Sequence, residues 1–366
     1  MPTGLQSFLR KALAPFALLY GMGVWLRNRL FDWKVLPAEQ YDLPVICVGN
    51  LAVGGTGKTP MTEYLIRLTR NRYRVAVLSR GYRRKSRGFQ LADSDSSSSE
   101  IGDEPYQIHR KFPDILVAVD ADRRRGIHNL LALPDRKRPE LILLDDAFQH
   151  RYVTPGLTFL LTDSHRLYTK DRLLPEGRLR EPIRGAERAD IIIVTKCDEG
   201  LQPIDYRLME EELHPKPHQL LLFSQIRYGE LEPLFPQEAE PIKLAKLTPE
   251  NEVLLLAGIA SPEPLIKEIG RYTERVTALT FPDHHDFGTR DMERITTAFR
   301  RLTDPRKIIL TTEKDAARLR DNTRLPETCR RYLYYLPIQV EFRGDGEQTL
   351  QKTVFKFIES TTKKHI

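Results

Sequence analysis

One glycine-rich segment of the sequence has the residue types and spacing of a phosphate-binding loop. It reads Ala52-Val53-Gly54-Gly55-Thr56-Gly57-Lys58-Thr59 and matches G-x-x-x-x-G-K-[ST], except that Ala52 stands in place of the first glycine. Glycines let successive backbone N–H groups turn toward phosphate oxygens. Lys58 would reach the β- and γ-phosphates, and the Thr59 hydroxyl would bind Mg²⁺. The segment therefore predicts a site for a nucleoside triphosphate.

Two adjacent carboxylates further along the chain supply the acidic residue that such a loop requires. Asp145 and Asp146 follow the apolar run 141–144. A carboxylate at the end of a neighbouring strand is the second protein contact of the metal ion in this class of site. Because adjacent side chains point in different directions, we expect only one of them to hold the metal, directly or through water. The other would orient a water molecule or a substrate hydroxyl.

A second class of nucleotide-binding protein stays open at this point. Thr195-Lys196-Cys197-Asp198 follows a predicted strand and resembles the [NT]-K-x-D motif with which GTPases recognise guanine. That motif would make the chain a regulatory switch rather than a kinase. GTPases also place D-x-x-G after the acidic strand, whereas here Asp146 is followed by Ala147-Phe148-Gln149, with no glycine. The kinase interpretation is favoured, and the GTPase-type switch is the alternative.

The elements that would position these residues alternate between strands and helices. Apolar runs predict strands at 43–48, 74–78, 115–119, 141–144 and 191–194, and a helix is predicted at 60–69, directly after the glycine-rich segment. Such alternation indicates a parallel sheet covered by helices on both faces. The predicted fold class is α/β: a P-loop NTPase-like parallel-sheet domain with a second, smaller α/β domain.

The length of 366 residues favours two domains over a single core. We expect an N-terminal helix over 1–30, the P-loop domain over 31–219, a connection over 220–241 and the smaller α/β domain over 242–366. The segment 334–342 would return as a second linker strand and pair with 220–227. The boundary rests on the Pro- and Glu-rich stretch 233–241.

Charge and cysteine content narrow the class of partner. The formal net charge of +7 favours anionic partners: nucleic acid, phosphate-bearing substrates or an acidic membrane. Cys47, Cys197 and Cys329 lie far apart in the sequence, which excludes a paired-cysteine metal motif. This sparse, odd number of cysteines suits a reducing compartment.

The N-terminus carries an uncharged stretch over 12–26 between basic flanks, Arg10 and Lys11 before it and Arg27 and Arg29 after it. The stretch is too short to span a bilayer comfortably. It predicts an amphipathic helix that lies in a membrane interface while its basic flanks reach anionic headgroups. The alternative is a first helix packed on the protein core.

Short segments in a fixed order make most of the chain resemble the tetraacyldisaccharide 4′-kinases of lipid A biosynthesis. They are Val48-Gly49-Asn50 through the phosphate loop to Pro60, Ser79-Arg80-Gly81-Tyr82, Gly102-Asp103-Glu104-Pro105, Asp145-Asp146-Ala147-Phe148-Gln149-His150, Leu179-Arg180-Glu181-Pro182, Ala257-Gly258-Ile259, Phe281-Pro282-Asp283-His284-His285 and Thr312-Glu313-Lys314-Asp315. The chain departs from the family at Ala147, where glycine is usual. It also reads Leu174-Pro175-Glu176-Gly177-Arg178-Leu179 where L-P-A-G-P-L is usual, which leaves the contacts near that loop open.

The resemblance implies a reaction, cofactors and a location. ATP, with Mg²⁺, would phosphorylate the 4′-hydroxyl of a tetraacyldisaccharide 1-phosphate to give lipid IVA. The family fold is two α/β domains with the active site in the cleft between them. The enzyme would be peripheral, on the cytoplasmic face of the inner membrane of a Gram-negative bacterium. Neither nucleic acid nor an obligate protein partner is implied.

The resemblance also implies a catalytic base. In the family, Asp103 of the G-D-E-P segment and a histidine of the D-H-H segment, His284, are thought to take the proton of the sugar hydroxyl. A carboxylate bound to one imidazole nitrogen fixes the tautomer and raises the basicity of the other. Two alternatives stay open: Asp103 caps a helix, or His285 is the active histidine.

Other carried-over roles concern the metal and the sugar. Glu181 resembles a family carboxylate near the metal, with a surface ion pair to Arg180 or Arg184 as its alternative. From their position just after a strand on the phosphate-loop side, Arg80 and Tyr82 are expected to meet the disaccharide or its 1-phosphate. Arg123 is expected to do the same or to belong to a basic face that attracts acidic membrane.

Overall fold

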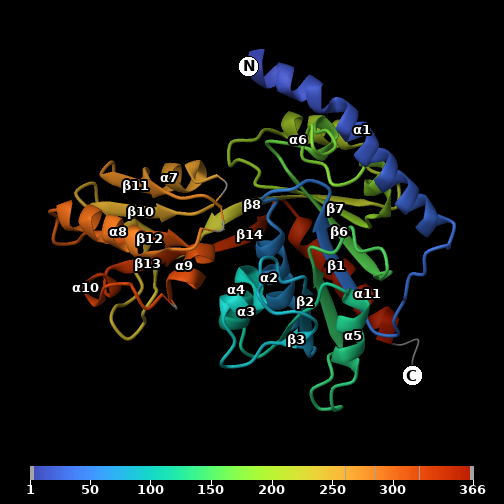
Figure 1. Ribbon diagram of the computed structural model, residues 1–366, viewed down its shortest axis with the longest axis horizontal. Coiled ribbons are helices and arrows are strands. Elements are labelled where there is room, and N and C mark those ends of the chain that lie inside the picture. Colours follow the sequence, from blue (N-terminus) through green and yellow to red (C-terminus); the bar gives the residue numbers. More distant parts are fainter. Residues whose placement is uncertain (1–3, 260, 284, 321, 363–366) are drawn as a thin grey trace.

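The computed structural model describes residues 4–259, 261–283, 285–320 and 322–362. Its strands form two sheets, which lie side by side in Figure 1. The larger sheet has nine strands in the order β14-β8-β7-β6-β1-β5-β2-β4-β3, and the smaller has five in the order β11-β10-β12-β13-β9. The predicted α/β class, with a large parallel sheet and a smaller second unit, is confirmed.

The larger sheet has β1 at its centre, with all six of its residues buried. Seven of its strands are mutually parallel, and β3 and β14 run antiparallel at the two edges. Strands buried on both faces are continuously apolar, which is why they could be recognised in the sequence. The strands are β1 (Val45–Asn50), β2 (Val75–Ser79), β3 (Gln90–Leu91), β4 (Leu116–Val119), β5 (Leu141–Asp145), β6 (Leu157–Asp163), β7 (Ile191–Thr195), β8 (Leu220–Tyr228) and β14 (Ile338–Phe342).

Helices cover both faces of this sheet. Because side chains alternate along a strand, Ile46 and Val48 of β1 enter a core with α2, α4 and α11, whereas Val45 and Cys47 enter a core with α5. A third core, on the side of β6 and β7, includes residues of α6, η1 and η2. The elements are α2 (Lys58–Thr69), α3 (Ser98–Ile101), α4 (Asp103–Lys111), α5 (Arg123–Leu131), η1 (Tyr168–Lys170), η2 (Ile183–Arg188), α6 (Pro203–Leu213) and α11 (Gly346–Thr362).

The smaller sheet is parallel except for β9, which runs antiparallel to β13. One of its faces packs on α8 and α9, and the other packs on α7. Its elements are β9 (Glu232–Pro233), η3 (Leu244–Lys246), β10 (Val253–Ala257), α7 (Glu263–Ile269), β11 (Val276–Thr280), α8 (Thr289–Arg301), β12 (Ile308–Thr312), α9 (Glu313–Arg320), α10 (Glu327–Arg330) and β13 (Leu333–Leu336).

The C-terminal part of the chain differs from the expected domain over 242–366. The segment expected as one strand at 334–342 forms two: β13 stays in the smaller sheet, and β14 pairs antiparallel with β8 in the larger one. After β14, α11 packs on the P-loop core through Leu350, Val354 and Ile358. These side chains recur every four residues and so share one helix face. Helix α11 therefore belongs to the larger unit and not to the smaller one.

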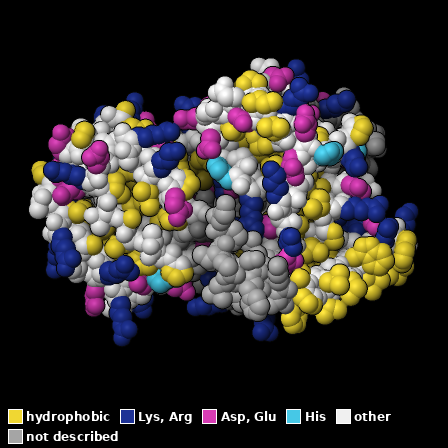
Figure 2. All heavy atoms as spheres, turned by 90° about the horizontal axis from the view of Figure 1, so that it is seen from above, with side chains coloured by type: hydrophobic (Ala, Val, Ile, Leu, Met, Phe, Trp, Pro, Cys, Tyr) yellow, Lys and Arg dark blue, Asp and Glu magenta, His cyan; other side chains and the backbone are white. Residues whose placement is uncertain are grey.

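Helix α1 (Gly4–Asp32) lies along one side of the larger unit (Figure 1). Ala17 and Phe31 are buried against the protein, whereas a row of large apolar side chains faces outward: Phe16, Leu18, Leu19, Met22, Trp25 and Leu26. Figure 2 shows these side chains as a hydrophobic band at the lower right. Over the described part of the chain, no helix has an apolar stretch long enough to cross a membrane.

The two units meet where α4 lies against α9. Lys111 of α4 forms ion pairs with Glu63 of α2, at 2.6 Å, and with Glu313 of α9. Arg318 of α9 forms an ion pair with Asp103, the first residue of α4. Charged side chains from the phosphate-loop helix, α4 and α9 thus join the two units.

Candidate active site

The glycine-rich loop lies between the central strand β1 and α2, which begins at Lys58. Two of its glycines have positive φ, +114° at Gly54 and +86° at Gly57. Residues with a side chain rarely adopt such backbone angles. The loop thus uses its glycines for the turn that leads into the N-terminus of α2, where a helix favours anions.

Contacts from three other segments fix the loop backbone. The Asn50 amide donates to the Thr56 hydroxyl at 2.7 Å, and the Thr195 hydroxyl donates to the Thr56 carbonyl at 2.9 Å. The Val53 amide donates to the Arg178 carbonyl at 2.8 Å. A loop held in this way needs little reorganisation to receive phosphates.

The side chain of Lys58 points toward the acidic strand end. Its Nζ lies 3.7 Å from Oδ1 of Asp146, and Arg180 donates from one nitrogen to both oxygens of the same carboxylate, at 2.9 and 3.1 Å. Burial alone would raise the pKa of Asp146, but the cations Lys58 and Arg180 outweigh it and lower that pKa. Asp146 is therefore an ionised carboxylate between two cations.

The neighbouring Asp145 has a different environment. It is buried, and it accepts hydrogen bonds from the hydroxyls of Thr62, at 3.2 Å, and Ser79, at 3.4 Å. Burial, followed by the charges of Glu104 and Asp146, raises the pKa of Asp145 to about 7. A cation beside this carboxylate would relieve that unfavourable charge.

The residues expected to hold Mg²⁺ offer hard oxygen donors of the kind that Mg²⁺ prefers. Thr59 is the second residue of α2, and Asp145 and Asp146 end and follow β5. No set of three His, Cys, Asp or Glu side chains within the described residues is grouped closely enough to hold a metal. Mg²⁺ in phosphoryl-transfer sites is ordinarily bound by one or two carboxylates plus phosphate oxygens and water, so this donor set fits it.

Glu181, expected near the metal, has other partners in the structure. It is buried and accepts from Arg188 at both oxygens, at 3.0 and 2.8 Å, from Gln149 at 3.0 Å and from Asn28 at 3.2 Å. Its ion-pair partner is thus Arg188, neither Arg180 nor Arg184. These contacts tie α1, η2 and the segment after Asp146 together.

The three residues expected to contact the disaccharide differ in position. Arg80 and Tyr82 are exposed just after β2, beside the strand that carries Asp145. Arg123 is only 2% exposed, and its guanidinium donates to the carbonyls of Asp120, Ala121, Asp145 and Asp146. The expectation of a substrate contact does not fit this position: Arg123 supports the backbone that carries the two carboxylates.

The expected base involves residues from both units. Asp103 begins α4 and pairs with Arg318, while His284 lies outside the described residues. His285 stacks on Phe281 with ring centroids 4.9 Å apart, and its Nε2 lies 2.9 Å from Oδ2 of Asp291. Through these contacts the His285 side chain packs and pairs within the smaller unit.

The segment that resembled a guanine-recognition motif supports the phosphate loop. Besides its bond to Thr56, Thr195 donates to the Thr162 carbonyl at 3.1 Å, and Lys196 pairs with Asp163 at 2.8 Å. The Asp198 carboxylate lies 3.1 Å from Nε2 of His165. The motif connects β6, β7 and the loop.

Sequence reasoning missed three residues of the site: Arg180, Thr195 as a support of the loop, and Arg318. Arg180 stands beside Glu181 in the L-R-E-P segment, and that motif could have drawn attention to it. No local pattern identifies Arg318, because its partner Asp103 is 215 residues away.

Comparisons with known proteins agree on one family. The family model described as tetraacyldisaccharide-1-P 4′-kinase matches residues 9–358. The chain is 64% identical to the tetraacyldisaccharide 4′-kinase of Parabacteroides distasonis, over 97% of this chain and 96% of that one. It is 48% identical to the same enzyme of Bacteroides thetaiotaomicron, over 97% and 95%. A crystal structure of LpxK from Aquifex aeolicus in complex with ATP is similar, with a TM-score of 0.73 and 29% identity, over 96% of this chain and 99% of that one.

Proposed function

The chain belongs to the tetraacyldisaccharide-1-P 4′-kinase family, and on that premise we propose that it transfers the γ-phosphoryl group of ATP to the 4′-hydroxyl of a tetraacyldisaccharide 1-phosphate, giving lipid IVA. The observation that carries the proposal is the match over residues 9–358, which includes the phosphate loop, the acidic strand end and the contact between the two units. The Aquifex relative, solved with ATP, supports ATP as the nucleotide.

In the proposed reaction the sugar oxygen forms a bond to the γ-phosphorus, and the bond between that phosphorus and the bridging oxygen of ADP breaks. Catalysis of this transfer is mainly a matter of position and charge. The loop amides and Lys58 would bind the phosphates, and Asp146, which is itself held by Arg180, would orient Lys58. The geometry that supports this is the 3.7 Å contact between Lys58 and Asp146.

We assign Thr59 and, of the two carboxylates, chiefly Asp145 to Mg²⁺, because Asp146 already pairs with Lys58 and Arg180. When bound, Mg²⁺ neutralises charge on the β- and γ-phosphate oxygens. Thr62 and Ser79 hold the Asp145 carboxylate in a fixed orientation. Glu181 is the weaker candidate, because its carboxylate is engaged by Arg188, Gln149 and Asn28.

The proton of the sugar hydroxyl requires a base, because the hydroxyl is not ionised near neutral pH. We assign this role to Asp103 together with His284, and the contact of Asp103 with Arg318 gives the carboxylate a fixed orientation. Arg80 and Tyr82, exposed beside the acidic strand end, are the candidates for the sugar. Arg123 acts on these groups indirectly, through the carbonyls of Asp145 and Asp146.

The acceptor is an anionic lipid, and α1 fits a role in reaching it. Its outward apolar side chains would enter the acyl boundary of the inner membrane from the cytoplasmic face, while Arg29 stays among headgroups. Arg27, which was also expected there, faces the protein and donates to the Gln149 carbonyl at 2.9 Å. The protein would thus be a peripheral enzyme of a Gram-negative bacterium, as expected from its relatives.

A transfer assay tests the proposal. Radiolabelled ATP and a tetraacyldisaccharide 1-phosphate in mixed micelles, with Mg²⁺, should give a labelled lipid, and excess GTP should compete poorly. EDTA should stop the transfer. If the label appears only as inorganic phosphate while the lipid stays unchanged, or if GTP is preferred, the result supports the GTPase-type alternative instead.

A further inference from the structure

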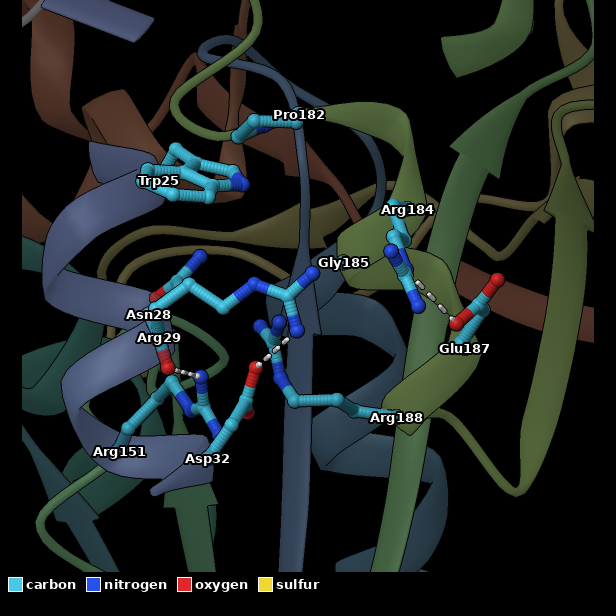
Figure 3. A pocket seen from close by; sticks show the side chains of 10 residues that line it. All are labelled: Trp25, Asn28, Arg29, Asp32, Arg151, Pro182, Arg184, Gly185, Glu187 and Arg188. Carbon is cyan, nitrogen blue, oxygen red and sulfur yellow. Dashed lines mark hydrogen bonds and ion pairs between the residues drawn. The ribbon is translucent and has the colours of Figure 1, made fainter. Parts of the chain in front are cut away.

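A pocket of about 160 Å³ lies between the C-terminal half of α1 and η2 (Figure 3). Its walls include Trp25, Arg29 and Asp32 of α1, Arg184 and Arg188 of η2, and Arg151. In Figure 3, Arg29 extends from α1 toward η2, and Arg184 lies on the opposite wall. A pocket of this volume has room for a phosphate group.

Two of the four arginines are fixed and form the floor. Arg151 donates to the Asn28 carbonyl and to Asp32, both at 2.8 Å, and Arg188 is bound to both oxygens of Glu181. Such charge-assisted bonds at short distance hold a side chain in place. The floor is therefore rigid and is already neutralised in part by carboxylates.

The other two arginines, at the mouth, are held weakly. Arg29 lies 4.0 Å from Asp32, and the exposed Arg184 lies 3.4 Å from Glu187. Surface ion pairs of this kind contribute little stability, so either guanidinium can exchange its partner at low cost. Four arginines face the three carboxylates Asp32, Glu187 and Glu181, and Arg29 and Arg151 share Asp32, so the pocket keeps an excess of one positive charge.

The pocket also adjoins the apolar face of α1. Leu18, Met22 and Trp25 are all exposed, and with Arg29 they follow a spacing of four, three and four residues. Residues at such spacing lie one above the other on a helix. The apolar row of Leu18, Met22 and Trp25 therefore ends at the guanidinium of Arg29, in the wall of the pocket. On the η2 side, the exposed Ile183 precedes Arg184.

The pocket lies apart from the groups that we assign to the sugar. Arg80 follows β2, on one side of β1 in the sheet order, whereas η2 leads into β7, on the other side. Arg188 ends η2 just before β7 begins at Ile191, and its guanidinium donates to the Phe148 carbonyl and to Glu181. The floor of the pocket therefore adjoins the segment after Asp146, whereas Arg80 lies across β1 from it.

We propose that this pocket binds the phosphate group of a bilayer glycerophospholipid, with Arg29 and Arg184 as its ligands and with the acyl chains along the apolar row of α1. Arginine binds phosphate through two parallel N–H groups, which gives it a geometric preference over other anions. The proposal rests on the proposed attachment of α1 to the membrane. It adds that this attachment is selective for lipids with a phosphate headgroup.

The test compares two double variants of the full chain that lose the same charge. Arg29→Gln with Arg184→Gln removes the mouth of the pocket. Arg227→Gln with Arg275→Gln removes two exposed arginines from β8 and from the smaller unit. Each protein is sedimented with vesicles of digalactosyldiacylglycerol, a neutral lipid without phosphate, that contain either phosphatidylglycerol or cholesteryl hemisuccinate, at equal surface charge. The hemisuccinate vesicles carry a carboxylate charge and contain no phosphate.

We expect the wild type to prefer phosphatidylglycerol, and the pocket variant to bind those vesicles about tenfold more weakly. The control variant should change less than twofold, and the difference between the two anionic lipids should disappear only in the pocket variant. Equal losses on both lipids, or wild-type binding by the pocket variant, would overturn the proposal.

The transfer assay in detergent micelles separates this proposal from the proposed function. The pocket variant should keep its turnover there, because no residue of the transfer site is changed. If its KM for the micellar acceptor rises while binding to phosphatidylglycerol vesicles stays at the wild-type level, the pocket holds the 1-phosphate of the substrate and the phospholipid assignment is wrong. If wild-type protein transfers no phosphate, the proposed function fails whatever the vesicles show.

Discussion

The two adjacent carboxylates after β5 have opposite electrostatic environments. Asp146 lies between Lys58 and Arg180, which lower its pKa, whereas burial and the nearby Glu104 raise the pKa of Asp145 to about 7. Neighbours in sequence can differ in this way because their side chains leave the chain in different directions. The pair therefore has one carboxylate with cations already in place and one that favours an added cation.

The Lys58→Ala variant should lose most of its turnover without unfolding. Removing one group that stabilises transition-state charge lowers kcat by about 10²- to 10³-fold. Asp146 would keep its two contacts with Arg180, so the deletion leaves no unpaired buried charge. The check is kcat in the micelle assay beside a thermal melt, with the exposed Lys85→Ala as control. Turnover close to that of the wild type would remove Lys58 from the phosphate site.

His150 gives a pH-dependent prediction. Burial and the nearby Arg123 lower its pKa from 6.5 to about 4, and its Nε2 accepts the Arg123 amide at 3.2 Å. Between those two pH values the unfolded chain binds a proton that the folded chain does not. Stability from this residue is therefore present above about pH 6.5 and lost as the pH falls toward 4, by up to about 3 kcal/mol.

The His150→Gln variant keeps a hydrogen-bond acceptor that does not titrate in this range. Its free energy of unfolding in urea should fall less than that of the wild type between pH 6.5 and pH 4. The exposed His218→Gln control should keep the wild-type dependence. Parallel curves for all three proteins would show that His150 does not titrate as described.

At the scale of elements, α1 uses its two sides differently. Ala17 and Phe31 pack on the protein, and Asn28 donates to Glu181 at 3.2 Å. Deleting the helix would therefore also expose part of the larger unit. Substitutions on the outward side separate the two roles, because they leave the packed side unchanged.

The Leu19→Gln, Met22→Gln double variant should bind vesicles at least tenfold more weakly, since each buried apolar side chain contributes about 1.5–3 kcal/mol. Its melting temperature and its KM for ATP should stay near those of the wild type. Ile204→Gln with Leu208→Gln, which changes two exposed apolar residues of α6, is the matched control. If both double variants sediment like the wild type, α1 is a structural helix and the membrane contact lies elsewhere.

Elements with a local signal could be predicted from the sequence, and those defined by distant contacts could not. The phosphate loop and the strands β1 and β5 carry their pattern within a few residues. The segment 333–342 has one continuous extended pattern, yet it divides between two sheets at Pro337, because β13 and β14 pair with different partners. Arg318 could not be identified from the sequence for the same reason, because its role depends on Asp103 in the other unit.

At the scale of the whole molecule, the two units share charges across the contact of α4 and α9. Arg318 donates to Asp103 of the P-loop unit and, at 3.2 Å, to Asp315 of its own unit. Asp315 in turn accepts the Gly258 amide and the Thr312 hydroxyl, both at 2.8 Å. The orientation of the proposed base is thus linked to the backbone of the smaller unit.

If this link positions Asp103 for proton transfer, replacing Arg318 should change the pH dependence of the reaction as well as its rate. In Arg318→Met the carboxylate loses an adjacent cation, which favours its protonated form. The acidic limb of the kcat/KM profile should then move to higher pH by about one unit, and kcat should fall more than tenfold. Arg318→Lys, which keeps the charge but not the planar fork, should recover the position of that limb and part of the rate.

The Asp315→Asn variant distinguishes a purely structural role of Arg318 from a role in positioning Asp103. Leaving one member of a buried ion pair unpaired costs about 3–5 kcal/mol, so Arg318→Met and Asp315→Asn should both destabilise the protein, as thermal melts would record. Only Arg318→Met removes the contact with Asp103, so only its profile should shift along the pH axis. If Asp315→Asn shifts the profile equally, or if Arg318→Met lowers the rate at every pH by the same factor, Arg318 stabilises the contact between the units without acting on the base.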